Sequence, residues 1–373
     1  KPLAFVPIYF GYEKVVEGIS YLKELRGSAK QQEQLSDLLA NMNVVRQNFG
    51  TLQVNVAPPI KLDEWLSEHR ALQTSETDAV ISLGDAIMRS INAQASINPV
   101  NLVALAITQR THFTVHEDAL AGQISCYQQL GKELHGESIL TANVEAEENI
   151  IDQVAALGFI RRQTDEPWIS CTSSAATLLT WYRNNVLHLF AAPALVALLI
   201  SRAREGIEQQ QLAEQCRTIY PFIAQELTTS EELQLEPVLD VLHRMKLITS
   251  EDGQLWQASK PGEYHEQLLQ LSTLLLELLQ RLYVVICIAN QALLNRDDLR
   301  ALSQASARKL ARLFGLQGAE FSEDRLFDLF IDTLISKQYL TLDEQDRLIA
   351  SSLLHQVAEQ AAQQVIDPAI HLA

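Results

Sequence analysis

Apolar and polar positions follow two different patterns along this chain, and the change between them divides it near residue 77. Residues 3–10 form an apolar, β-branched and aromatic run that predicts a buried strand. Apolar positions at helical spacing predict a helix over 14–50, residues 54–60 read as a second strand, and 62–70 as a short helix. This order of strands and helices is typical of part of an α/β domain.

Beyond residue 77 the chain repeats itself. The segment Leu102–Ile107 returns as Leu195–Ile200, 93 positions later, with a proline shortly before each copy. Three aspartates are each followed by apolar residues 7 and 16 positions further on: Asp152 by Phe159 and Trp168, Asp240 by Leu247 and Trp256, and Asp332 by Tyr339 and Leu348. Internal repeats of this length indicate stacked structural units.

Each unit reads as a set of helices, an apolar turn and a short hairpin. The hairpin turns are marked by Asp165-Glu166-Pro167 in the first unit and by Asp252-Gly253 in the second. Helices closed by a small hairpin are the pattern of a winged helix. The predicted units are therefore residues 78–180, 181–268 and 269–373, after a first domain at 1–77.

Charge argues against nucleic acid as a partner. The net charge is −17, and the helices that precede the three hairpins, 150–157, 238–245 and 325–335, carry at most one arginine each. The negative net charge also disfavours broad attraction to anionic lipid unless basic groups are locally concentrated. Four cysteines stand far apart without metal-ligand spacing, so we expect buried thiols.

Two apolar runs approach the length of a membrane span without reaching about 18 residues. They are Val186–Ile200, interrupted by His188 and Pro193, and Leu282–Leu294. We expect core helices here. The alternative is that part of this surface meets lipid from one side without crossing it.

One segment carries a resemblance to a known family. Residues 5–27, FVPIYFGYEKVVEGISYLKELRG, run from a Val-Pro-Ile-Tyr strand through a Gly-Tyr-Glu turn to a Lys-Glu-Leu-Arg-Gly helix end. This closely resembles the fourth conserved block of the membrane-bound bacterial glycerol-3-phosphate acyltransferases. The likeness extends over most of the chain, with further matches at 52–60, 91–93, 98–102, 181–185 and His188.

That resemblance implies an activity and also a missing part. Members transfer an acyl chain from acyl-CoA or acyl-carrier protein to the 1-hydroxyl of glycerol 3-phosphate, using a His-x4-Asp motif and no metal or redox cofactor. None of the nine histidines here is followed by aspartate at the fifth position, and the near match from His112 to Asp118 has the wrong register. We therefore expect a carboxy-terminal portion of a longer enzyme, inactive alone and holding no catalytic residue.

The implied fold is mainly α (α+β): the end of an α/β acyltransferase domain followed by three winged-helix-like helical repeats. The implied location is the cytoplasmic side of the bacterial inner membrane, peripheral or monotopic, with the membrane surface as a partner. The alternative from another class is a non-catalytic helical-repeat module that docks on a membrane or a partner enzyme.

Five residues are candidates for substrate binding through the resemblance. Pro7, Tyr9 and Glu13 belong to the strand and turn that lie beside the active site in the family, and core or turn positions are the alternative. Lys23 and Arg26 are cations suited to a phosphate, which arginine binds bidentately. A solvated helix face is the alternative for this pair.

Overall fold

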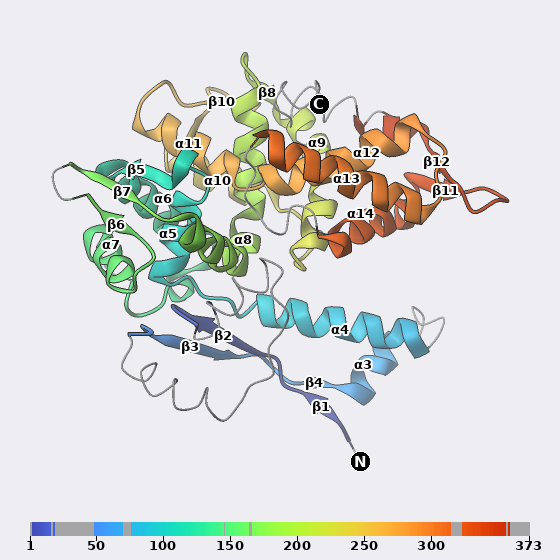
Figure 1. The fold of residues 1–373 in the computed structure, drawn as a ribbon, viewed down its shortest axis with the longest axis horizontal. Helices are drawn as coiled ribbons and strands as arrows, with labels where there is room; N and C mark the ends of the chain where they lie inside the picture. The colour runs from blue at the N-terminus through green and yellow to red at the C-terminus, as the bar shows by residue number, and fades with distance from the viewer. Residues whose placement is uncertain are drawn as a thin grey trace. The chain divides into compact units, whose positions relative to one another are not determined.

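The computed structural model describes residues 2–15, 18, 48–69, 76–144, 146–163, 166–314, 323–355 and 357–358, and these are mainly helical. They divide into two compact units, Lys1–His188 and Leu189–Ala373 (Figure 1). The finer division into four domains stays a prediction. Most of the predicted helix at 14–50 lies outside the described residues, and so do Lys23 and Arg26.

The first unit begins with two antiparallel strand pairs. Proline interrupts strand pairing at two places, because proline has no N–H to donate. The run 3–10, which predicts one strand, is divided at Pro7, and β3 ends before Pro58-Pro59. The resulting pairs are β1 (Ala4–Phe5) with β4 (Ile60–Lys61), and β2 (Ile8–Tyr12) with β3 (Leu52–Val56).

The helices of the first unit are built around α5 (Pro99–Ile107), in which all nine residues are buried. Pro99 at the first helical position and the Asn98 cap before it fix where this helix begins. The others are α3 (Leu62–Glu68), α4 (Glu76–Asn92), α6 (Glu117–His135), α7 (Glu147–Ala156) and the first half of α8 (Ser173–Arg202), with single turns η3 (Thr111–Phe113) and η4 (Glu137–Ile139). α5 packs against α6 and α7, and α4 packs against β2.

In the second unit the core lies around α12 (Leu276–Gln291), most of which is buried. α14 (Asp324–Ser336) packs against α12 and two further helices, α9 (Gln209–Glu226) and α13 (Arg296–Phe314). The unit also contains α10 (Leu235–Arg244), α11 (Glu263–Thr273) and the second half of α8.

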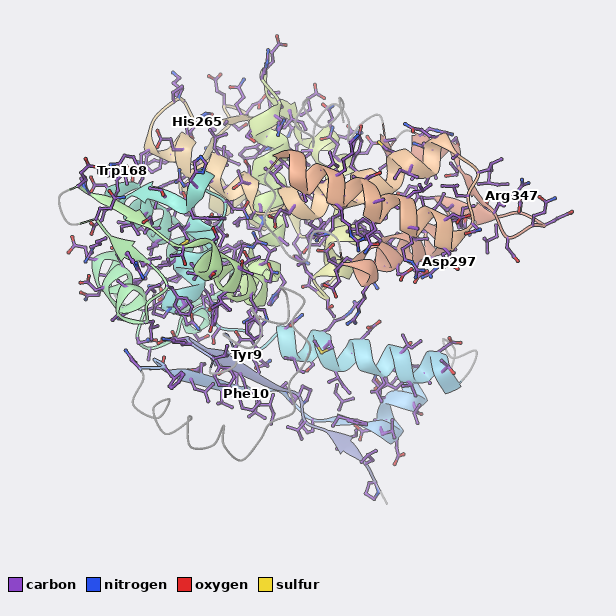
Figure 2. All side chains as sticks on the ribbon, in the orientation of Figure 1. Tyr9, Phe10, Trp168, His265, Asp297 and Arg347 are labelled. Carbon is purple, nitrogen blue, oxygen red and sulfur yellow. The ribbon has the colours of Figure 1, made fainter. Side chains whose placement is uncertain are left out.

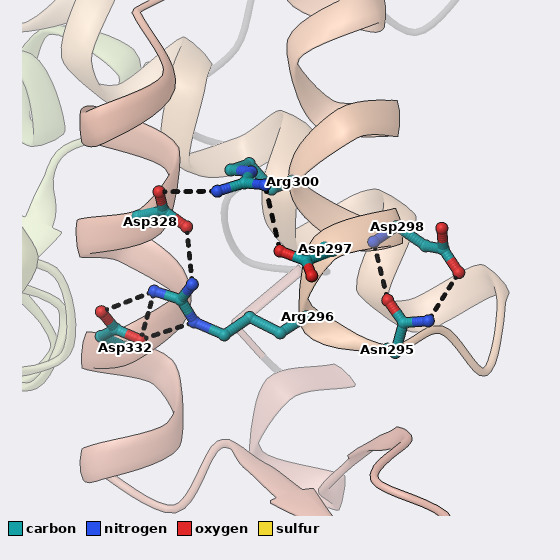
Figure 3. Close-up of polar contacts among 7 residues, drawn as sticks. All are labelled: Asn295, Arg296, Asp297, Asp298, Arg300, Asp328 and Asp332. Carbon is teal, nitrogen blue, oxygen red and sulfur yellow. Dashed lines mark hydrogen bonds and ion pairs between the residues drawn. The ribbon is translucent and has the colours of Figure 1, made fainter.

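α13 and α14 are also joined by an ion-pair network, drawn in Figure 3. Arg296 contacts Asp328 at 2.9 Å and Asp332 at 2.8 Å, while Arg300 contacts Asp297 at 3.0 Å and Asp328 at 3.2 Å. The arginines are partly exposed, and exposed ion pairs contribute little individually. The network therefore fixes the register of the two helices more than it adds stability.

Three hairpins lie where the sequence analysis expected them. Two of them carry a third strand from further upstream, and in both sheets that strand pairs with the second hairpin strand. The strands are β5 (Thr114–His116), β7 (Trp168–Ser170) and β6 (Arg161–Arg162) in the first sheet; β8 (Ile207–Glu208), β10 (Leu255–Ala258) and β9 (Ile248–Thr249) in the second; and β11 (Leu340–Leu342) with β12 (Leu348–Ala350).

The register of these sheets also repeats. The residue 16 positions after each repeating aspartate pairs with an upstream residue in every case: Trp168 with His116, Trp256 with Ile207, and Leu348 with Leu294. The helix before each hairpin also ends in the same way. The second residue after it has a positive φ, and the N–H of the following residue bonds to the carbonyl five residues back, which belongs to Val154, Leu242 or Leu334, as in a Schellman motif.

By length and composition, one described helix, α8, is apolar enough to cross a membrane, and 67% of its qualifying window is buried. α11 and α12 meet the same test together, across a bend of 46°. α8 extends well beyond the 15-residue run Val186–Ile200 identified from the sequence. Its burial agrees with a core helix, since core helices pass the same test.

Replacing Asn101 with alanine should lower the free energy of unfolding by about 2–4 kcal/mol, because it leaves the buried N–H of Asn98 without its acceptor and removes a second hydrogen bond to Tyr182. At the exposed start of α13, the Asn295 side chain accepts the N–H of Asp298 and donates to its carboxylate (Figure 3). Asn295→Ala should therefore lower the free energy of unfolding by only about 1 kcal/mol. Denaturant unfolding followed by circular dichroism measures both, and equal losses would contradict the argument.

Candidate functional site

Residues 13–51 separate β2 from β3, and we call this antiparallel pair the β2–β3 hairpin. Its buried face meets the helices of the first unit through polar groups. The hydroxyl of Tyr9 donates to the backbone oxygen of Ser96 at 3.4 Å, and the Asn55 side chain donates to that of Gln94 at 2.8 Å. Burial raises the pKa of the Tyr9 hydroxyl above its usual value. Tyr9 is thus a neutral donor that holds the hairpin to the loop before α5.

Glu13 closes the end of the same hairpin, with only 3% of its surface exposed. Its carboxylate accepts hydrogen bonds from the N–H of Thr51 at 2.9 Å, from the Thr51 hydroxyl at 2.7 Å and from the side chain of Asn143. Gly50 has a φ of +69°, and a Cβ there would lie 2.0 Å from a Glu13 oxygen, so the turn requires glycine. The carboxylate is therefore committed to contacts within the fold.

Pro7 is also buried, and its carbonyl accepts a hydrogen bond from the N–H of Ala57 at 3.0 Å. Because side chains alternate along a strand, Pro7, Tyr9 and Glu13 all lie on the helix-facing side of the hairpin. The structure thus brings three of the five predicted site residues to one face. Their contacts agree with the core-and-turn alternative, and their binding of substrate stays a prediction.

A group of amides and a tyrosine joins the hairpin to α5 and α8. Asn98 and Asn101 form a reciprocal capping box at the start of α5. From this box Asn98 donates to the carbonyl of Tyr12 at 3.3 Å, and Asn101 donates to that of Tyr182 at 2.8 Å. The Tyr182 hydroxyl in turn accepts the N–H of Val15 at 2.9 Å. We call these the joint residues: Asn98, Asn101 and Tyr182.

The sequence signal for these residues was present but incomplete. The asparagine before Pro99 is a typical helix cap, whereas nothing in the spacing pairs Asn101 with Tyr182, which is 81 positions later. In the structure Arg183 is buried and its guanidinium donates to the Asn184 side chain, while Tyr182 makes the contacts to the hairpin.

A cavity of about 670 Å³ lies at the end of the hairpin. Aromatic rings form much of its wall. Among the described residues that line it, Lys14 is the one with a charge, and its Nζ donates to the carbonyl of Leu157 at 2.9 Å. The rings are those of Phe10, Tyr12, Phe49, Trp181 and Tyr182. Such a wall suits an apolar or flat group better than a phosphate, which needs several free donors.

The histidines offer no catalytic pair within the described residues. His116 lies 3.6 Å from Asp118 at an exposed position, and His112 sits in a left-handed backbone conformation with a φ of 55°. Among the described residues no group of three or more His, Cys, Asp or Glu is arranged to hold a metal ion.

His188 is half-buried on α8, and its ring is hydrogen-bonded. Its Nε2 lies 3.0 Å from the backbone oxygen of Asn92, so this nitrogen carries the proton and donates it. Burial lowers the pKa of His188 to about 4. The neutral ring thus ties the end of α4 to α8.

Comparison with known proteins places this architecture in context. A family model described as "Glycerol-3-phosphate acyltransferase C-terminal region" matches residues 21–343. Proteins named glycerol-3-phosphate acyltransferase from Pseudomonas paraeruginosa and Ectopseudomonas mendocina are 32% identical to the chain over 394 and 393 residues, and one from Pseudomonas fluorescens SBW25 is 31% identical over 393. Each match covers 100% of this chain and 47% of the relative. The chain therefore spans about half the length of these relatives.

Acid should destabilise the protein through His188. Above pH 6.5 the ring is neutral in both states; between about pH 6.5 and 4 the unfolded chain binds a proton that the folded chain does not. The free energy of unfolding should thus fall by up to about 1.4 kcal/mol per pH unit in this window from this group. Unfolding curves from pH 7 to 4 measure this slope.

His188→Gln retains a donor for the Asn92 carbonyl without the titration, so the slope should become shallower. His355, on the exposed surface, provides the matched control, and His355→Gln should leave the slope unchanged. Identical slopes for the wild type and the His188 variant would contradict this role for His188.

Proposed function

Since the chain belongs to the family of glycerol-3-phosphate acyltransferase C-terminal regions, we propose that it is the carboxy-terminal portion of an enzyme that acylates glycerol 3-phosphate. The observation that carries this is the match over residues 21–343, together with relatives of that name along the whole chain. The acyl donor in the proposal is acyl-CoA or acyl-carrier protein. The product, lysophosphatidate, is the first intermediate of phospholipid synthesis.

In this proposal the chain supplies structure and substrate contacts, and the general base belongs to the other half. A hydroxyl nucleophile needs a positioned base, and none of the nine histidines is followed by aspartate at the fifth position. The acyl donor already carries an activated thioester, so the reaction needs no metal or redox cofactor. The rival candidate is a non-catalytic helical-repeat module.

Within the site we assign different tasks to the five predicted residues. Tyr9, Glu13 and Pro7 fix the hairpin, as their buried hydrogen bonds support. Lys23 and Arg26 are the proposed ligands of the substrate phosphate, because a doubly charged anion needs cationic donors and Lys14 is the one cation among the described residues that line the cavity.

The three helix-and-hairpin units are, in this proposal, related winged-helix-like repeats. Support comes from the shared strand order of the first two sheets and from the shared register at Trp168, Trp256 and Leu348. Their role is structural rather than nucleic-acid binding, since the net charge is −17 and the helices before the hairpins carry few basic residues.

We further propose that the enzyme works at the cytoplasmic face of the bacterial inner membrane, bound to the surface without spanning it. The acyl chain of the product is apolar and is delivered to a bilayer. The burial of most of the apolar window of α8 supports a packed helix over a spanning one.

The direct test is activity in two settings. The purified chain should release no CoA above background in the presence of glycerol 3-phosphate. In the chimera, the segment of the Pseudomonas paraeruginosa relative that aligns with this chain is replaced by this chain, and the amino-terminal part of the relative is kept. This chimera should restore the release of CoA. Activity of the chain alone would refute the assignment of the base to the other half. A folded but inactive chimera would favour the non-catalytic module.

In the active chimera, Arg26→Ala should raise the KM for glycerol 3-phosphate about 10- to 150-fold, since a hydrogen bond to a charged group contributes roughly 1.5–3 kcal/mol. The KM for the acyl donor should change little. Arg26→Lys should recover only part of the loss, because an ammonium lacks the planar fork of arginine. Equal KM values for glycerol 3-phosphate in the wild type and the alanine variant would contradict this role and favour the alternative, in which Arg26 belongs to a solvated helix face.

A further inference from the structure

The outer face of the β2–β3 hairpin is apolar and exposed. Six side chains form it as three directly opposed pairs, Ile8 with Val56, Phe10 with Val54, and Tyr12 with Leu52. Each of the six is between 37% and 59% exposed. We call these six residues the open face; Figure 2 labels Phe10 on this face and Tyr9 on the opposite one.

The polarity of this hairpin is the reverse of the usual arrangement. Antiparallel sheets with one solvated face normally turn apolar residues inward and polar residues outward. Here the side that meets the helices of the first unit carries Tyr9, Glu13, Gln53 and Asn55, three of which bond to groups outside the hairpin or across its end. Turning the hairpin over to bury the open face would break the hydrogen bonds of this polar side.

An open face of this kind is unfavourable in water. Directly opposed apolar pairs on a sheet contribute to stability only when they are packed, and a two-stranded ribbon alone is marginal. Among the described residues, nothing lowers the exposure of these six side chains below 37%. The chemistry of the face, with no charged group among the six residues, specifies an apolar partner.

The size of the face favours a partner in the same polypeptide. Separate proteins usually need about 20–30 residues on each side for a stable interface, whereas this face offers six. A covalently linked segment needs far less contact area, because its effective concentration at the face is high. The relatives contain such a segment, since this chain matches 47% of their length and 100% of its own.

We propose that the open face binds the amino-terminal half of the acyltransferase, which packs an uncharged helix surface onto these three pairs. This inference rests on the proposed function. The hairpin is then a layer shared by two parts of the enzyme: its polar side joins the helical region, and its apolar side joins the half that holds the base. Phe10, Tyr12 and Leu52 belong to both the open face and the cavity wall, so the cavity lies at the edge of that contact.

The test compares Val54→Glu in the chain alone and in the full-length chimera. In the chain alone the glutamate meets water, so the unfolding midpoint should shift by less than about 2 °C and the binding of an apolar dye should fall. In the chimera the same charge would be buried unpaired, and the midpoint should fall by about 5–10 °C. Leu342, a 55% exposed residue on β11, is the matched control, and Leu342→Glu should be tolerated in both.

Three results would overturn the proposal. The chimera could tolerate Val54→Glu as well as the chain alone does. Light scattering of the chain could show a dimer that Val54→Glu dissociates, which would make a second copy the partner. Vesicles of phosphatidylethanolamine and phosphatidylglycerol could bind the wild-type chain and not the variant, which would make lipid the partner. All these readouts are independent of activity, so an inactive chimera with the expected midpoints would refute the proposed function alone.

Discussion

The buried hydrogen bonds of Asn98, Asn101 and Tyr182 are the constraint on which the first unit depends. The two asparagines satisfy each other's backbone at the start of α5, and their remaining donors reach Tyr12 and Tyr182. Buried amide groups left without partners are costly, so one helix start fixes the hairpin and α8 together. The position of the cavity, which lies between the hairpin and α8, follows from this arrangement.

The hairpin itself shows how a small element can serve two neighbours. Its polar face is held by specific hydrogen bonds, which define a single orientation, whereas its opposite face is apolar except for the hydroxyl of Tyr12. Directional bonding on one side and non-directional packing on the other allow the hairpin to be placed firmly before its second side is covered. The buried Glu13 carboxylate contributes to this placement and is not available as a free charge.

Much of the architecture could be predicted from the sequence, because it rests on local signals. The first apolar run located β1 and β2 without separating them, and the repeated apolar segment Leu102–Ile107 lies in α5. The three hairpins could be placed because the repeat positions their apolar residues. Which face of the β2–β3 hairpin is buried could not be predicted. The alternation of Tyr9 and Phe10 shows that the two faces differ, but it does not show which of them the helices cover. The Asn101–Tyr182 contact spans 81 positions and leaves no periodic trace.

α8 belongs to both compact units, since it runs from Ser173 to Arg202 and the division falls after His188. Helix formation is cooperative, and a helix interrupted at its middle loses hydrogen bonds on both sides of the break. The two units are therefore compact without being independent modules. Evolution by shuffling or insertion would have to leave this helix whole, and a gene fusion or a split of the chain is more readily tolerated in the loops on either side of it than at the boundary between the units.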